Sequence, residues 1–400
     1  MTLRRLAAVT LLALAVAGCR STHHTGATPG SPRATTSPAA ADWREVALPT
    51  GPGRPSVRDL VTCGGVWYLV GYRTAADGQT SPAAWTSRDG GRSWQVLPAQ
   101  PAPGSVYGPL HQYSAAACVP DRLAAIGSAT GGSHGMARTS NWYAVAGGPL
   151  REVISAVELY GGSQAIAVNR LAGGPAGWVI AGAREDANTD PGAAVWVSPD
   201  AVDFTLVDGD PALESRAGEV TSAADVTWDG HGWTLVGDRT VVKSGGAGRT
   251  AMAWTSRDGR TWTRQYAPAA GTDADAPQRV VPYRGGVLAL GLHGDRFGAW
   301  RRDAAGRWAW GGAFGHTDVT RGKVGVQSLA VAGDVAYAAV ADGTAITLWT
   351  SGDGAHWRRL AAPVPLAGGA DDRLLVASDG TTVVAATDDA LLPRLFTLAP

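Results

Sequence analysis

Short apolar runs alternate with polar turns along most of this chain. The runs are rich in Val, Leu and Trp, and the turns contain Gly or Asp-Gly, a pattern typical of antiparallel β-hairpins. Clear examples occupy residues 60–71, 224–237, 281–291, 329–340 and 374–386. No sustained helical periodicity appears after the first 18 residues. The pattern therefore predicts an all-β fold.

A second repeated pattern follows the hairpins. A strand that ends in Trp leads into a tight Ser-x-Asp-Gly turn, and an aromatic residue then starts the next strand. The pattern occurs at 85–94, 196–204, 254–262 and 349–357, and a diverged copy occurs at 300–308. A hairpin followed by these two strands makes a unit of four antiparallel strands. Such units, recurring about every 40–55 residues, indicate a β-propeller in which each unit is one blade.

Seven blades can be placed along the chain. They fall near 57–99, 112–148, 165–209, 220–265, 276–312, 324–360 and 371–400. The last unit ends on its third strand, whereas the segment 42–49 resembles the fourth strand at 93–98. We therefore expect 42–49 to pair with the C-terminal blade and close the ring, since closure removes exposed sheet edges. The second and seventh units are diverged, so six or eight blades remain open as alternatives.

The N-terminal segment has the features of a processing signal. Arg4 and Arg5 precede an apolar stretch over 6–16, which is too short for a membrane span. The following Val-Ala-Gly-Cys at 16–19 resembles a bacterial lipoprotein lipobox. This resemblance implies acyl chains such as palmitate on Cys19, which would anchor the protein on the extracytoplasmic side of the cell membrane without spanning it. An ordinary secreted protein that is cut nearby is the alternative.

The domain organisation follows from this signal. Residues 1–18 are expected to be the signal peptide, and 42–400 the propeller. Between them, 19–41 has almost no large apolar residue, which predicts a disordered, lipid-anchored tether.

The remaining cysteines form a candidate pair. Cys63 lies eight residues before Gly71, and Cys118 nine before Gly127, and these glycines occupy equivalent positions in neighbouring repeats. Outside the cytoplasm such a pair favours a disulfide, here one that joins the first two blades.

Composition narrows the range of partners. Lys+Arg and Asp+Glu are equal in number, at 34 each, so the chain lacks the basic excess of a nucleic-acid-binding protein. Most of the 16 Trp residues fall in the repeats, where their first role is packing. The sequence shows no metal or cofactor motif, and we expect a monomer that needs no cofactor.

The Ser-x-Asp-Gly turn with its following Trp resembles the Asp-box, or BNR repeat, found in sialidases, sortilin-like receptors, some xyloglucanases and a plastid photosystem assembly factor. The matching positions are Ser87, Asp89, Gly90 and Trp94; Ser198, Asp200 and Phe204; Ser256, Asp258, Gly259 and Trp262; Asp303 and Trp308; and Ser351, Asp353, Gly354 and Trp357. The Asp and Ser side chains can cap backbone N–H groups in their own turn, and Gly accepts a positive φ. The resemblance therefore implies a sialidase-like fold with structural turns on the outer rim of the blades.

Catalysis has weaker support than binding. A sialidase would hold its substrate carboxylate with three Arg residues and attack with a Tyr activated by Glu. The first Arg normally lies in an Arg-Ile-Pro-like motif, but the chain offers only Gly-Arg-Pro at 53–55. The other members of such a site cannot be assigned, and no other catalytic motif is present, so the catalytic residues stay unknown.

A binding surface is expected at the mouth of the central channel. The connections from each outer strand to the next inner strand are long and polar, at 100–112, 149–164, 210–219, 266–278, 313–323 and 361–372. Candidate binding residues on or beside them are Arg58, Asp59, His111, Tyr113, Glu152, Glu158, Arg216, Glu219, Arg279, Arg321, Lys323 and Arg373. The interpretation is a binding or assembly module for a protein or a cell-envelope glycan. A glycan-active enzyme of sialidase type and a purely structural envelope lipoprotein are the alternatives.

Overall fold

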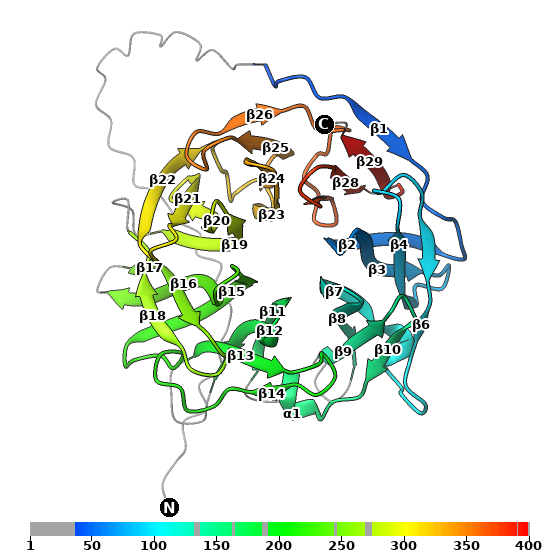
Figure 1. Ribbon diagram of the computed structural model, residues 1–400, viewed down its shortest axis with the longest axis horizontal. Helices are drawn as coiled ribbons and strands as arrows, with labels where there is room; N and C mark the ends of the chain where they lie inside the picture. The colour runs from blue at the N-terminus through cyan, green and yellow to red at the C-terminus, as the bar shows by residue number, and fades with distance from the viewer. Residues whose placement is uncertain are drawn as a thin grey trace, which may run out of the picture. The chain divides into compact units, whose positions relative to one another are not determined.

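A ring of seven β-sheets makes up the second of two compact units, residues 38–400, in the computed structural model (Figure 1). The structure describes residues 37–131, 137–161, 165–185, 191–243, 246–268, 274–389 and 391–398. The predicted signal peptide, Cys19 and most of the predicted tether lie outside these residues.

Each sheet is one blade, whose strands follow one another from the channel outward. Blade 1 is β2 (Arg54–Cys63), β3 (Val66–Thr74), β4 (Thr80–Ser87) and β5 (Gln95–Leu97). Blade 2 is β7 (Gln112–Val119), β8 (Arg122–Thr130), β9 (Ala137–Val145) and β10 (Leu150–Val153), and blade 3 is β11 (Ala165–Gly174), β12 (Gly177–Arg184), β13 (Gly192–Ser198) and β14 (Thr205–Leu206).

The remaining blades repeat this order. Blade 4 is β15 (Glu219–Trp228), β16 (Trp233–Lys243), β17 (Gly246–Ser256) and β18 (Thr263–Tyr266). Blade 5 is β19 (Asp275–Tyr283), β20 (Gly286–His293), β21 (Arg296–Arg302) and β22 (Trp308–Phe314), and blade 6 is β23 (Val324–Ala332), β24 (Val335–Asp342), β25 (Ile346–Ser351) and β26 (Arg358–Leu360). Blade 7 is β27 (Arg373–Ser378), β28 (Val383–Asp388), β29 (Arg394–Leu398) and β1 (Trp43–Val46).

The ring closes through the first strand, as predicted. β1 pairs antiparallel with β29, with Trp43 opposite Leu398, so the two ends of the propeller share one sheet. The Trp43 indole donates a hydrogen bond of 2.8 Å to the Ala361 carbonyl, and Arg394 holds Glu45 with two bonds of 2.6 and 2.7 Å. The prediction of seven four-stranded blades is thereby confirmed.

Blade 2 carries one strand more than the prediction. The two-residue strand β6 (Ala99–Gln100) continues from blade 1 and pairs parallel with β10, where Ala99 lies opposite Leu150. The short helices η1 (Gly108–Leu110) and α1 (Val157–Tyr160) both lie in connections between blades. Among the described residues, no helix is long and apolar enough to cross a membrane.

A β-bulge interrupts the inner strand of each of the first six blades. The residues that the register skips are Arg58, Ser114, Asn169, Ala224, Gln278 and Gln327. The bulge brings the inner backbone very close to the second strand: a Cβ on Gly71 would lie 1.9 Å from the Ser56 carbonyl oxygen, and one on Gly237 would lie 1.9 Å from that of Ser222. Glycine is required there because any side chain would collide with backbone. These bulges re-aim side chains at the channel.

The Asp-box turns join the third and outermost strands, where the resemblance implies them. The Asp258 carboxylate accepts hydrogen bonds of 2.8 Å from the N–H groups of Arg260 and Thr261 and 3.0 Å from the Ser256 hydroxyl. The Trp262 indole donates a hydrogen bond of 2.9 Å to the Gly259 carbonyl, and this bond closes the turn. Gly259 has φ +74°, and Ala201, which replaces that Gly in blade 3, still adopts φ +65°. These carboxylates are therefore used for local structure.

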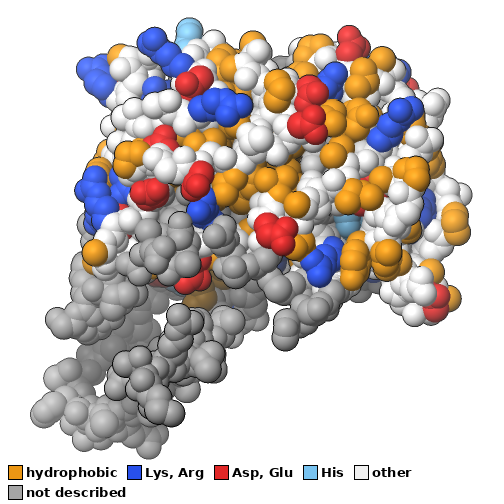
Figure 2. All heavy atoms as spheres, turned by 90° about the horizontal axis from the view of Figure 1, so that it is seen from below, with side chains coloured by type: hydrophobic (Ala, Val, Ile, Leu, Met, Phe, Trp, Pro, Cys, Tyr) orange, Lys and Arg blue, Asp and Glu red, His pale blue; other side chains and the backbone are white. Residues whose placement is uncertain are grey.

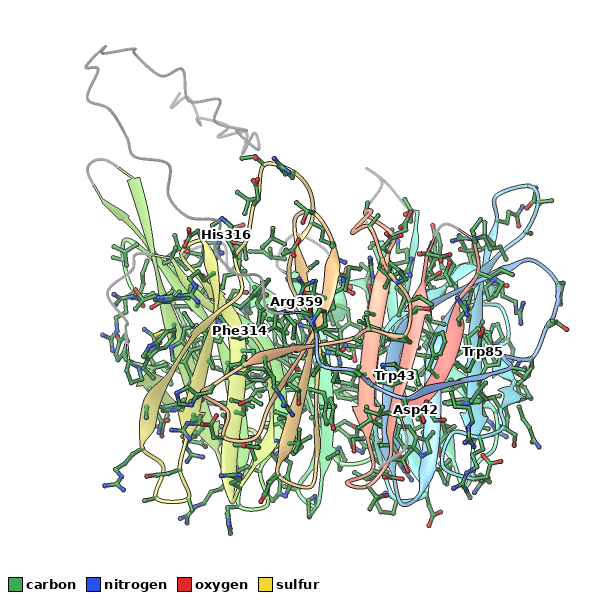
Figure 3. The ribbon with its side chains drawn as sticks, turned by 90° about the horizontal axis from the view of Figure 1, so that it is seen from above. Asp42, Trp43, Trp85, Phe314, His316 and Arg359 are labelled. Atoms are coloured by element: carbon green, nitrogen blue, oxygen red, sulfur yellow. A yellow bond between two sulfur atoms is a disulfide. The ribbon has the colours of Figure 1, made fainter. Side chains whose placement is uncertain are left out.

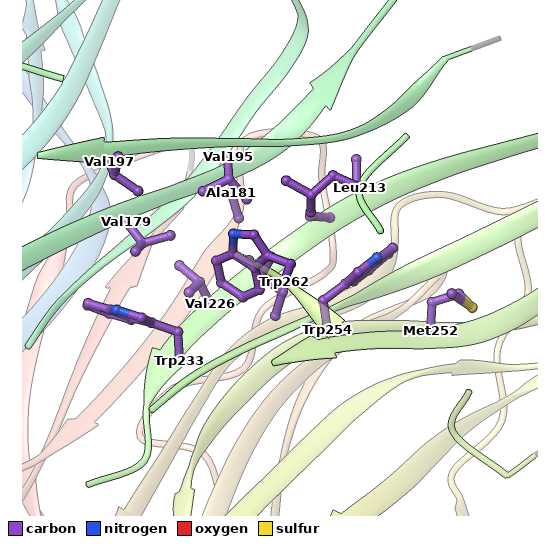
Figure 4. Close-up of a cluster of buried hydrophobic side chains, with 13 residues drawn as sticks. Val179, Ala181, Val195, Val197, Leu213, Val226, Trp233, Met252, Trp254 and Trp262 are labelled. Carbon is purple, nitrogen blue, oxygen red and sulfur yellow. The ribbon is translucent and has the colours of Figure 1, made fainter. Parts of the chain in front are cut away.

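The tryptophans pack between blades. Figure 4 shows one such cluster, in which Trp233, Trp254 and Trp262 from blade 4 contact Val179 and Val195 from blade 3. Five of the six third-strand tryptophans are fully buried, namely Trp85, Trp142, Trp196, Trp254 and Trp300, whereas Trp349 is partly buried. Truncating one such side chain to Ala costs about 3–5 kcal/mol, so the repeated Trp holds neighbouring blades together.

The predicted disulfide is present between the first two blades. Cys63, at the end of β2, bonds to Cys118 near the end of β7, with 6.0 Å between their Cα atoms.

The outer wall seen in Figure 2 mixes basic, acidic and apolar side chains, so the described residues form no large field of one sign on this side.

Candidate anion-binding site at the channel mouth

All seven inner strands begin on the same face of the ring. The antiparallel order inside each blade places the connections from outer strands to inner strands on this face, together with those between second and third strands. We call it the mouth face. In the edge-on view of Figure 3 the strands run between two faces, and His316, in one of these connections, lies toward the upper one. The Asp-box turns lie on the opposite face.

Four basic side chains converge where the channel opens on the mouth face. Arg58 on β2, Arg279 on β19, Arg373 on β27 and Lys323 just before β23 line a cavity of about 510 Å³. We call these four residues the cationic mouth. A cavity of this size can hold a ligand rather than a single ion.

Few acidic groups offset this charge. The Arg58 guanidinium donates a hydrogen bond of 3.1 Å to the buried Asp388 carboxylate. The same carboxylate accepts a hydrogen bond of 3.0 Å from the Val57 N–H. Asp371 lies 3.9 Å from Arg58 but is 80% exposed, so solvent weakens its influence. The cationic mouth therefore keeps an excess of positive charge.

The pKa values reflect this excess. Burial, followed by the charges of Arg373, Arg58 and Arg279, lowers the pKa of Lys323 to about 8. Burial and then the neighbouring Arg170 lower the pKa of Arg279 to about 10, against the opposing effect of nearby carboxylates. Perturbed groups that share a cavity are typical of functional sites, and an anion bound here would relieve the repulsion.

An ion-pair layer crosses the channel beneath the mouth. Arg170, on β11 of blade 3, lies 2.9 Å from the Asp59 carboxylate of blade 1 and 3.8 Å from that of Asp225 in blade 4. Arg170 and Arg279 line both the mouth cavity and a second cavity of about 470 Å³ toward the opposite face. The layer therefore divides the channel into two compartments.

The acids of this layer also join neighbouring blades. Asp59 accepts the N–H of Leu60 at 3.0 Å and, from blade 2, the N–H of Ala116 at 2.8 Å. Asp225 likewise accepts the N–H of Val226 at 2.9 Å and, from blade 5, the N–H of Val280 at 3.0 Å. Each carboxylate thus binds its own strand and the next blade at once.

Neutral side chains make the same connection elsewhere in the ring. The Gln278 amide oxygen accepts the Val326 N–H of blade 6 at 2.8 Å, and that of Gln327 accepts the Leu374 N–H of blade 7 at 2.9 Å. Because the inner strands are cross-linked by these bonds, the basic side chains rise from a rigid base. Preorganised charges of this kind bind an anion without a large reorganisation cost.

The predicted site residues fall into separate groups. Arg58, Arg279, Lys323 and Arg373 come together at the mouth, and Asp59 lies in the ion-pair layer below them. Arg321 stays on the mouth face but pairs with Asp318 at 3.2 Å and does not line the cavity.

Arg216 and Glu219 lie at the start of β15, away from the channel. Glu219 is buried, binds the Arg264 guanidinium at 2.6 Å and accepts the Arg216 N–H at 3.0 Å. This group fixes the connection between blades 3 and 4 rather than facing a ligand. Glu158 lies in the first turn of α1.

His111 and Tyr113 are in the core and not at the mouth. Both are fully buried; the Trp142 indole donates to His111 at 3.1 Å, and Tyr113 packs edge-on against the same ring at 5.3 Å. Burial, with the charge of Glu152, raises the pKa of Tyr113 well above its usual range, and Glu152 itself accepts bonds from Ser105 and Ser140. The connection before β7 folds inward between blades, which is why these residues are covered.

Sequence reasoning missed Arg170, although a signal for it exists. In the aligned inner strands, the residue after the bulge is charged in four of the six blades, namely Asp59 in blade 1, Arg170 in blade 3, Asp225 in blade 4 and Arg279 in blade 5. Charged residues that alternate in sign at one repeat position are a reason to expect an ion-pair layer.

A polar cavity of about 460 Å³ lies on the opposite face, between blades 4 and 5. Its acidic residues include Asp229, Asp258 and Asp303. Asp229 pairs with Arg302 at 2.9 Å, and the two others bind N–H groups of their own turns. Among the described residues, no three His, Cys, Asp or Glu side chains are grouped to hold a metal ion.

The fold and site define an all-β, seven-bladed propeller with a basic channel mouth. No protein-family model matches the chain, and no curated protein is similar to it in sequence. Solved structures are similar in fold. A Hadza microbial sialidase, Hz136, is 15% identical over 86% of this chain and 65% of its own, with a TM-score of 0.49.

Two further structures show the same likeness. The β-propeller domain of the Trilobed protease from Pyrococcus furiosus is 10% identical over 87% of this chain and 94% of its own, at a TM-score of 0.48. The Trypanosoma rangeli sialidase bound to 2,3-difluorosialic acid is 12% identical over 91% of this chain, at a TM-score of 0.47. This chain covers 59% of that sialidase. The likeness concerns the propeller fold and carries no activity over to this chain.

Proposed function

We propose that this protein is a lipid-anchored, extracytoplasmic binding module whose channel mouth binds an anionic group of a partner protein or a cell-envelope glycan. The observation that carries the proposal is the convergence of Arg58, Arg279, Lys323 and Arg373 on one cavity whose described lining contains no Asp or Glu. Guanidinium groups bind carboxylate or phosphate in a bidentate manner, and an ammonium group adds a point charge.

Binding explains the arrangement better than catalysis. A layer of paired charges crosses the channel directly below the mouth, and the buried Tyr113 cannot reach a ligand held there. Tyr72 is engaged by Arg58, whose guanidinium donates to its hydroxyl at 2.6 Å. The lipobox-like segment supports membrane anchoring, which would hold this mouth near envelope components.

The test uses the full-length lipoprotein in detergent micelles. Citrate and pyrophosphate serve as probes in calorimetric titrations of the wild type, of Lys323→Ala and of Arg373→Ala. Arg321→Ala is the matched control, because Arg321 carries the same charge on the same face outside the cavity. We expect each mouth variant to weaken binding about tenfold, the loss of one charge-assisted contact, while the control binds as the wild type does. Equal binding by all four proteins, or none by the wild type, would refute the proposal.

A further inference from the structure

A groove on the mouth face borders the cavity of the cationic mouth. It lies between blades 2 and 3, measures about 380 Å³, and shares Ser114 and Val168 with the mouth cavity. We call it the side groove. Ile126, Tyr160 and Ile166 supply apolar surface to its wall, and Ser128 and Thr139 supply hydroxyl groups. A basic cavity and a groove of mixed apolar and polar lining therefore lie side by side, close enough for one extended ligand to contact both.

The exposed apolar residues favour the same face. Eight of the ten large hydrophobic side chains that are exposed among the described residues lie in its connections or at the strand ends beside them, namely Val106, Ile154, Ile166, Val220, Tyr266, Val319, Leu391 and Leu392. Val319, at 73% exposed, follows β22, and Leu391, at 78%, follows β28. A partner that covers this face would bury these side chains and gain from their removal from water.

We infer that the site takes an acidic peptide segment of a partner protein, with its carboxylates in the cationic mouth and a neighbouring apolar side chain in the side groove. The inference rests on the proposed function and names its ligand class. Charge complementarity selects the acidic end. Hydroxyl groups in the groove match the N–H and C=O groups of a peptide backbone, and the spread of apolar residues over several connections exceeds the footprint of a small anion.

The probe is a short fluorescein-labelled peptide in which a run of aspartates is followed by Leu and Phe. A second peptide has Ser in place of both apolar residues. Binding to the full-length lipoprotein in detergent is followed by fluorescence anisotropy, and citrate binding is measured in parallel by calorimetry. The groove variants are Ile166→Asn, which removes an exposed apolar side chain, and Thr139→Trp, which fills the groove. Val145→Asn is the matched control, because Val145 is similarly exposed, at 45%, on the opposite face.

We expect both groove variants to weaken the apolar peptide about tenfold, the value of burying one large side chain, and to leave citrate binding unchanged. The Ser-containing peptide is expected to bind the wild type as weakly as the apolar peptide binds the variants. Val145→Asn should match the wild type with every probe.

Equal binding of the two peptides, with citrate binding intact, would overturn this inference and leave the proposed function standing. A second outcome would also overturn the inference and leave the proposed function standing. In it, vesicles of anionic lipid bind the wild type but not Ile166→Asn, and neither peptide binds. Failure of citrate and both peptides together would refute the proposed function as well.

Discussion

Arg170 of blade 3 reaches across the channel to Asp59 of blade 1, with 2.9 Å between the guanidinium Nη1 and the carboxylate Oδ2. The pair links two blades that are not neighbours in the ring. Because Asp59 also binds the backbone of blade 2, one ionic contact ties three blades together beneath the mouth. Burial works against the charge of Arg170, but Asp59 and Asp225 outweigh this effect and raise its pKa.

Removing Arg170 should destabilise the whole ring. The substitution Arg170→Met leaves the buried Asp59 carboxylate without its ion-pair partner, which typically costs about 3–5 kcal/mol. Urea denaturation of the propeller, followed by tryptophan fluorescence, measures the change in unfolding free energy. The double variant with Asp59→Asn should recover part of this loss, since one uncompensated charge is then gone. A loss below about 1 kcal/mol for Arg170→Met would show that the layer is not cohesive.

The affinity for anions should depend on pH through Lys323. Its pKa of about 8 means that the ammonium form, which attracts an anion, is lost as the pH rises. A bound anion raises that pKa, so citrate affinity should fall from about pH 8 upward, in a range where citrate itself no longer changes its charge. Calorimetric titration across this range measures the profile. Lys323→Arg, which stays charged, should remove the decline in affinity. If the variant shows the same decline as the wild type, a titrating group other than Lys323 causes it.

Lys323 should also oppose folding near neutral pH. A lysine whose pKa is lowered in the folded state binds fewer protons there than in the unfolded chain, so stability rises with pH between the folded value of about 8 and the ordinary value of 10.5. We therefore expect Lys323→Met to raise the thermal midpoint at pH 7 and to have less effect above pH 10.5. Scanning calorimetry at both pH values tests this. A lower midpoint at pH 7 would contradict it.

Reduction of the disulfide should weaken the junction between blades 1 and 2. The bond between Cys63 and Cys118 closes a long loop, and its loss in the double Ser variant should cost about 2–4 kcal/mol. Hydrogen exchange should rise first in β2 and β7, since local opening occurs where cross-links are lost. Dithiothreitol should lower the thermal midpoint of the wild type and leave that of the variant unchanged. Uniform exchange in all blades would argue against a local role.

Membrane attachment should depend on Cys19. Replacement by Ala removes the proposed acyl site, and the protein should then leave the membrane fraction while the propeller stays folded. Fractionation followed by immunoblotting measures the distribution, and Cys63→Ser with Cys118→Ser serves as a control for cysteine loss. A cleaved, soluble wild-type protein would instead support ordinary secretion.

The repeats in the sequence predict the architecture because their signals are local. A Ser-x-Asp-Gly turn caps its own N–H groups and a glycine opposite a bulge avoids a backbone collision, wherever the unit stands in the chain. The closing strand at Trp43 was also predictable, since the last unit lacked a fourth strand and an unpaired edge must be covered. The equivalent positions of Cys63 and Cys118 likewise followed from counting residues along each repeat.

The candidate site could be predicted only in part. Arg58, Arg279, Lys323 and Arg373 were among the sequence candidates because they lie where inner strands begin. His111 and Tyr113 met the same criterion, yet their connection folds between blades and buries them. Burial of a loop depends on packing against neighbouring blades, which no local pattern encodes.

The sequence by itself therefore determined the repeated unit and predicted the ring closure and the disulfide, since each depends on contacts between residues near in the chain or at matching repeat positions; it favoured seven blades, and the structure settled that number. Only the tertiary structure decided which charges meet. Arg58, Arg170, Arg279 and Arg373 lie in four different blades and converge because the ring brings the starts of all inner strands to one axis. Closure of the ring, not spacing along the chain, sets the distances between them and hence the charge of the mouth.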